Sequence, residues 1–132
     1  MGDFVDCLTV SQHSKDPKRK LRLIDELDGA SELLDDLAEL GSECQYIEGN
    51  HGYRLSRFIQ DKCPELDGLV KTIPEYLELE ERNWGFTPYM DYFKVGKLYM
   101  THDVGYHGKT AIRRSQDDFG ANLCIGHVHR LD

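Results

Sequence analysis

Helix-type and strand-type patterns alternate along this chain, and that alternation constrains its fold more than any other feature. Early in the chain, five apolar residues follow one another at helical spacing: Leu23, Leu27, Ala30, Leu34 and Leu37. They predict an amphipathic helix of about five turns, which Gly41 ends. The later patterns predict helices over residues 53–62 and 109–118 and strands over 44–47, 97–101 and 121–125.

The remaining segment, about 64–94, is expected to be an irregular insert rich in aromatic residues. The order of elements therefore predicts an α/β fold, with residues 1–132 forming a single domain. The hydrophobic share of 39% suits a folded chain. No apolar run is long enough to span a membrane, and Met1-Gly2-Asp3-Phe4 does not resemble a secretory signal. We therefore expect a cytoplasmic protein without a membrane partner.

The net charge of −8 argues against a general binder of nucleic-acid backbones, so nucleic acid is expected only as a substrate. The four cysteines include no Cys-x-x-Cys pair, which argues against a zinc ribbon. Their wide spacing gives little support to a disulfide framework in a chain of this length. We interpret them as reduced thiols.

Each of the three predicted strands runs into a turn that carries histidine. These turns are Gly49-Asn50-His51, Thr101-His102 and Gly126-His127-Val128-His129. A single histidine there would more often be structural, but three such strand ends favour convergence on one ligand. Imidazole, amide and carboxylate groups together suit Mn²⁺, Fe²⁺, Zn²⁺ or Ni²⁺. His13 and His107 fall in predicted loops and are interpreted as surface histidines. An α/β domain with chance histidines remains the plain alternative.

These motifs resemble the calcineurin-like metallophosphoesterases, especially small bacteriophage or bacterial members. The family's ordered motifs are Asp-x-His, Gly-Asp-x-x-Asp, Gly-Asn-His-(Asp/Glu), an isolated His and Gly-His-x-His. The chain carries Gly2-Asp3-Phe4-Val5-Asp6, then Gly49-Asn50-His51, His102 and Gly126-His127-Val128-His129. The resemblance covers nearly the whole chain and implies a metallophosphoesterase-like α/β sandwich.

The resemblance also implies a role for each matching residue. Five would be metal ligands: Asp3, Asn50, His102, His127 and His129. His51 would stabilise or protonate the leaving group, Asp6 would orient the turn or a ligand, and Arg54 would contact phosphate. The implied activity is hydrolysis of a phosphate mono- or diester by metal-activated water, with one or two divalent ions per chain and Mn²⁺ preferred over Zn²⁺, Fe²⁺ or Ni²⁺.

The chain departs from the family pattern in several places. The Asp-x-His motif and its strand are missing, Gly52 replaces Asp or Glu, and Asp103 stands where Gly often follows the isolated histidine. The closing strands after His129 are also missing, so we expect a reduced sandwich with a truncated central sheet. A homo-oligomer or a partner chain would cover the exposed strand edges. The alternative function is a catalytically degenerate metal-binding domain that acts through protein–protein contact.

Overall fold

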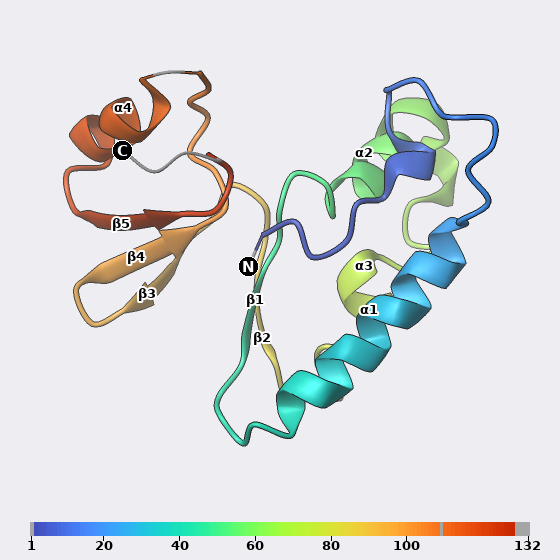
Figure 1. Cartoon of the computed structure of the whole chain (residues 1–132), viewed down its shortest axis with the longest axis horizontal. Helices are drawn as coiled ribbons and strands as arrows, with labels where there is room; N and C mark the ends of the chain where they lie inside the picture. The colour runs from blue at the N-terminus through green and yellow to red at the C-terminus, as the bar shows by residue number, and fades with distance from the viewer. Residues whose placement is uncertain (1, 109, 129–132) are drawn as a thin grey trace.

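The structure, a computed structural model, describes residues 2–108 and 110–128 of the chain. These residues form a mixed α/β fold with two small sheets (Figure 1). The helices are α1 (Leu23–Ala38), α2 (Arg54–Lys62), α3 (Ile73–Tyr76) and α4 (Ala111–Phe119), with 3-10 turns η1 (Leu8–Val10) and η2 (Pro64–Leu66). The strands are β1 (Gln45–Ile47), β2 (Gly85–Thr87), β3 (Phe93–Val95), β4 (Leu98–Thr101) and β5 (Asn122–Ile125).

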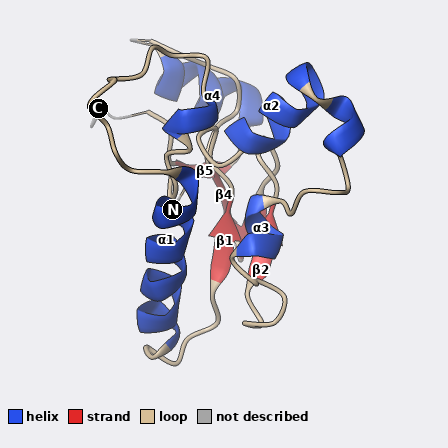
Figure 2. Ribbon diagram, turned by 90° about the vertical axis from the view of Figure 1, so that its right-hand side faces the viewer, coloured by secondary structure: helices blue, strands red, loops and turns tan. Residues whose placement is uncertain are grey.

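The amphipathic pattern predicted for α1 is confirmed. Leu27, Ala30 and Leu34 are buried, and they pack with Tyr46 of β1 and Ile73 of α3 in the hydrophobic core. Figure 2 shows α1 and α3 beside the β1–β2 pair, which places this core between the helices and the strands. Within the described residues, no helix is both long enough and apolar enough to span a bilayer.

The strands form two sheets, whereas the sequence predicted one truncated central sheet. Strand β1 pairs in parallel with β2, while β4 pairs antiparallel with β3 and in parallel with β5. The N-terminal segment lies between the two sheets, because Gly2 and Asp3 approach Gly49 after β1 and Gly2 also approaches His102 after β4. This segment is not a strand, so it does not join the two sheets by backbone pairing.

The predicted insert is more regular than expected. Residues 64–94 include η2, α3 and β2, and β3 begins at Phe93. Strand β2 pairs with β1, and Nε2 of Gln45 donates to Oγ1 of Thr87 at 2.8 Å. The insert thus supplies the second strand of the first sheet. The thiols of all four cysteines are free, as predicted: Cys7, Cys44, Cys63 and Cys124.

Candidate metal centre

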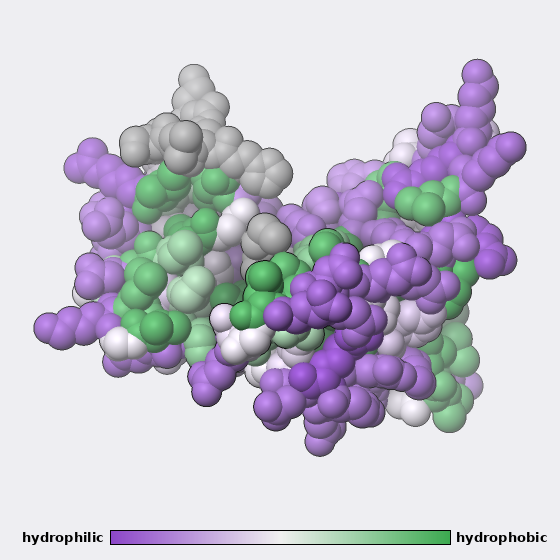
Figure 3. Space-filling view, turned by 60° about the horizontal axis from the view of Figure 1, so that its bottom comes forward, coloured by the Kyte–Doolittle hydropathy of each residue, from purple (hydrophilic) through white to green (hydrophobic). Residues whose placement is uncertain are grey.

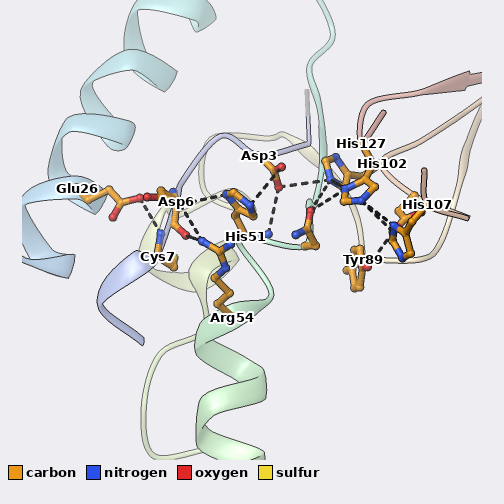
Figure 4. A network of polar contacts seen from close by, with 12 residues as sticks. Asp3, Asp6, Cys7, Glu26, His51, Arg54, Tyr89, His102, His107 and His127 are labelled. Carbon is orange, nitrogen blue, oxygen red and sulfur yellow. Dashed lines mark hydrogen bonds and ion pairs between the residues drawn. The ribbon is translucent and has the colours of Figure 1, made fainter. Parts of the chain in front are cut away.

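Four of the predicted metal ligands meet at one point between the two sheets (Figure 4). Asp3 comes from the N-terminal segment, Asn50 follows β1, His102 follows β4 and His127 follows β5. Nε2 of His102 lies 2.8 Å from Oδ1 of Asn50 and 3.4 Å from Oδ1 of Asp3. Nδ1 of His127 lies 3.1 Å from Oδ1 of Asn50 and 3.3 Å from Nε2 of His102. The predicted convergence of strand ends therefore holds for Asn50, His102 and His127, and Asp3 joins them from the N-terminal segment.

This spacing fits a metal ion. Ligand atoms bound at about 2.1 Å around one cation lie about 3.0–3.4 Å apart in octahedral and tetrahedral sites. The two imidazole nitrogens and two side-chain oxygens fall close to that range. Without a cation, two imidazole nitrogens 3.3 Å apart would compete for the same acceptor oxygen of Asn50. The donor set suits Mn²⁺, Fe²⁺, Zn²⁺ or Ni²⁺.

His102 is the most deeply buried of these ligands, at 2% exposure. Burial lowers the pKa of His102, while the carboxylate of Asp3 opposes that shift. The neutral imidazole, which is the form that binds metal, is therefore favoured. Its Nδ1 atom is buried and has no hydrogen-bond partner within residues 2–108 and 110–128. Nε2 is thus the ring atom that the structure directs to other polar groups.

Close backbone approach explains two of the glycines in the motifs. A Cβ atom on Gly49 would collide with the carboxylate of Asp3, and one on Gly2 would collide with the ring of His102. Both glycines therefore permit the N-terminal segment to lie against the turns that follow β1 and β4. They position Asp3 and His102 for their contact.

His51 lies beside this donor set and is not part of it. Its backbone N–H donates to Oδ1 of Asp3 at 3.1 Å, and its ring Nε2 lies 3.9 Å from Oδ2 of Asp3. Its Nδ1 lies 3.1 Å from Oδ1 of Asp6. Asp6 thereby holds one edge of the His51 ring and leaves the other edge directed toward the candidate metal centre.

Arg54 begins α2 and contacts Asp6 as well. Its Nη1 donates to the backbone oxygen of Asp6 at 2.6 Å and to Oδ1 at 2.8 Å. The side chain also lines a cavity beside the candidate centre. Its predicted contact with phosphate stays a prediction. His129, the remaining predicted ligand, lies outside the described residues.

His107 is a surface residue, as predicted, but the sequence did not predict its contact with the candidate centre. Its ring is exposed, yet Nδ1 lies 3.1 Å from Nε2 of His127. The same Nε2 lies 4.0 Å from Oδ2 of Asp103, a carboxylate of 2% exposure. Asp103, His107 and His127 form a second group with spacing that a cation could bridge. In the sequence, only the proximity of His107 to His102 hinted at this arrangement.

Asp103 is held by neighbours that donate hydrogen bonds to it. The N–H of Gly105 donates to Oδ1 at 2.8 Å, and the hydroxyl of Tyr89 donates to Oδ2 at 3.1 Å. Burial, together with the negative charge of Asp103, raises the pKa of Tyr89 to about 12, so this hydroxyl keeps its proton at neutral pH. His13, by contrast, is exposed as predicted.

Comparison of this chain with protein-family models, with curated proteins and with solved structures finds no match. The candidate metal centre therefore rests on the geometry of the residues that the structure describes.

Proposed function

We propose that this chain is a metal-dependent phosphoesterase that hydrolyses a phosphate mono- or diester by attack of water on phosphorus. The convergence of Asp3, Asn50 and two histidines from separate segments carries this proposal, because their donor atoms lie 2.8–3.4 Å apart. A divalent cation held there would acidify water and offset negative charge on the phosphoryl group.

The order of the motifs along the chain adds support, since it resembles that of calcineurin-like metallophosphoesterases. We propose the corresponding fold, a reduced α/β sandwich of that kind in one domain over residues 1–132. The parallel pairing of β1 with β2 and of β4 with β5 agrees with this proposal. The placement of the Gly2–Asp3 segment between the two sheets also supports it.

In this proposal, Asp3, Asn50, His102 and His127 hold one cation, with Mn²⁺ preferred. Asn50 contributes a neutral oxygen and the histidines contribute neutral nitrogens, so Asp3 supplies the single negative charge of the set. A positive charge therefore remains to attract a phosphate ester into a protein that is acidic as a whole. His129 is proposed as a ligand of a second cation.

His51 is proposed as the general acid. Nδ1 of His51 lies 3.1 Å from Oδ1 of Asp6, and this contact restrains the orientation of the ring. As the bond between phosphorus and the leaving oxygen breaks, the proton on Nε2 of His51 passes to that oxygen, and a neutral imidazole remains. The distance of 3.9 Å between Nε2 of His51 and Oδ2 of Asp3 supports this proposed role.

The alternative is a metal-binding domain without turnover that acts through protein–protein contact. The four described ligands provide for one cation, which favours this reading. Apolar side chains also gather over the lobe formed by β3, β4, β5 and α4 (Figure 3). Val95 on the edge strand β3 is 52% exposed and Leu98 on β4 is 38% exposed. We propose that a second copy or a partner chain covers this surface.

The experiment that separates these functions is release of p-nitrophenol from a p-nitrophenyl phosphodiester with added Mn²⁺. We expect turnover by the wild-type protein and a loss of at least about 100-fold in the Asn50→Ala, His51→Ala double variant. Asn122→Ala is a matched control, because Asn122 is an exposed residue of β5 outside the donor set.

Unchanged activity in the double variant would contradict the proposal. Tight binding of one Mn²⁺ per chain without turnover, together with a stable complex in size-exclusion chromatography, would favour the interaction domain instead.

A further inference from the structure

A cavity of about 340 Å³ borders the candidate metal centre. Asn50 and His127 of the centre form part of its lining. Helix α2 and residues 10–13 form much of the remaining wall. A phosphate ester that contacts the centre from this side would therefore place its organic group between α2 and residues 10–13.

The walls of this cavity are more basic than the protein as a whole. The chain carries a net charge of −8, yet His13, Arg57 and Lys62 all line the cavity. Asp61 is the acidic residue among the lining residues, and it lies 3.7 Å from Nε of Arg57. This ion pair is exposed, so it leaves Arg57 available to an anionic ligand. The cavity is thus suited to an anion.

The same walls also offer apolar and aromatic surface. Phe58 projects from α2, lines the cavity and is 40% exposed. The rings of Tyr53 and Tyr89 stack with centroids 5.5 Å apart, and both residues line the cavity. Covering such rings with a flat apolar group would remove apolar surface from water and stabilise a complex.

We infer that this cavity binds the organic group of a small phosphate ester that carries an aromatic or similarly flat apolar part. The inference rests on the proposed function, and it narrows the substrate to a small molecule. The cavity volume lies at the lower end of the range of about 300–1,000 Å³ that is typical of small-molecule sites. A phosphoprotein substrate would need an extended surface instead.

Phenylphosphonate and methylphosphonate test this inference, because they share an anionic head and differ in the aromatic ring. Their carbon–phosphorus bond resists hydrolysis, so calorimetric titration into the Mn²⁺-loaded protein measures binding without turnover. We expect phenylphosphonate to bind about tenfold more tightly than methylphosphonate. Phe58→Ser should reduce that preference to less than about threefold and leave methylphosphonate binding unchanged.

Matched controls separate the cavity from the rest of the surface. Leu66→Ser alters a residue of η2 that is 42% exposed and does not line the cavity, so it should keep the preference for the ring. Arg57→Ala should weaken binding of both phosphonates about fivefold. Arg113→Ala is the control for Arg57→Ala, because Arg113 forms a similar ion pair with Asp117 on α4. It should leave the binding of both phosphonates unchanged.

Equal affinities for the two phosphonates would overturn the inference, and so would tighter binding of a phosphoserine peptide than of phenylphosphonate. Either result would leave the proposed function intact if the wild-type protein still hydrolyses p-nitrophenyl esters. A retained preference for the ring without hydrolysis would uphold the binding cavity and contradict the phosphoesterase proposal.

Discussion

Nδ1 of His107 lies 3.1 Å from Nε2 of His127, whose opposite ring nitrogen lies within the candidate donor set. In the tautomer of His127 for which His107 is the acceptor, the ring proton of His127 lies on Nε2. Nδ1 of His127 is then free of a proton and able to bind a cation. We therefore expect His107 to fix the tautomer of His127, a candidate metal ligand, without binding that cation itself.

His107→Ala should therefore weaken Mn²⁺ binding by about 10- to 100-fold, the usual cost of removing a group that orients a ligand. His107→Asn should restore most of the affinity, because its side-chain oxygen can occupy the position of Nδ1 and accept the same proton. Calorimetric titration of Mn²⁺ measures both effects, with His13→Ala as the control at an exposed histidine. Equal affinities of His107→Ala and wild type would contradict this role.

Gly49→Ala tests the close approach of the N-terminal segment. The added methyl group would collide with the carboxylate of Asp3, so Mn²⁺ affinity should fall by at least about tenfold. Gly29→Ala is the matched control, because nothing lies within 4 Å of its Cβ position on α1. The control should keep its Mn²⁺ affinity and gain up to about 1 kcal/mol of stability from helix propensity. Undiminished metal binding by Gly49→Ala would show that Asp3 does not need this contact.

The predicted helices match the structure because apolar spacing is a local signal. Burial of Leu27 and Leu34 on α1 follows directly from that spacing. Apolar spacing does not predict strands β2 and β3, because each has only three residues and is defined by its pairing with another strand. The division into two sheets likewise depends on the N-terminal segment, which contacts both without strand pairing.

Prediction of proximity succeeds where a motif places a residue at a strand end, as for Asn50, His102 and His127, whose roles as metal ligands stay a prediction. It misses His107 because that residue lies in a loop whose course depends on backbone turns. Gly105 and Gly108 adopt φ values of +85° and +83°, and these turns flank His107. No periodicity or spacing in the sequence specifies the direction of such a loop.

The central position of Leu34 in the core yields a prediction of stability. Leu34 is fully buried on α1, so Leu34→Ala should lower the free energy of unfolding by about 2–5 kcal/mol through lost apolar contact and the cavity that remains. The neighbouring Leu33 is 47% exposed, and Leu33→Ala should change the free energy of unfolding by less than about 1 kcal/mol. Urea unfolding of both variants gives the comparison, and similar losses would contradict the assigned core.

The buried thiol of Cys7 makes the free energy of unfolding decrease at alkaline pH. Burial, reinforced by the charge of Glu26, raises the pKa of this thiol from 9.0 to about 12. In the unfolded chain the thiol ionises above about pH 9, whereas in the folded chain it stays neutral. Ionisation therefore stabilises the unfolded state as pH rises from about 9 to 12. Between pH 8 and pH 10, the contribution of Cys7 to the free energy of unfolding falls by about 1 kcal/mol.

Urea unfolding at pH 8 and pH 10 under reducing conditions measures this effect. Cys7→Ala should lose that part of the pH dependence. Cys124→Ala should retain it, because Cys124 is exposed. The same pH dependence in wild type and Cys7→Ala would disprove the assignment to Cys7.

The location of a bound cation tests the candidate metal centre most directly. Crystals soaked with Mn²⁺ and measured at the manganese absorption edge give an anomalous peak at each ion. We predict a peak about 2.1–2.3 Å from Asp3 Oδ1, Asn50 Oδ1, His102 Nε2 and His127 Nδ1. Fully occupied Mn²⁺ elsewhere in the protein, with no peak between these four atoms, would contradict the account.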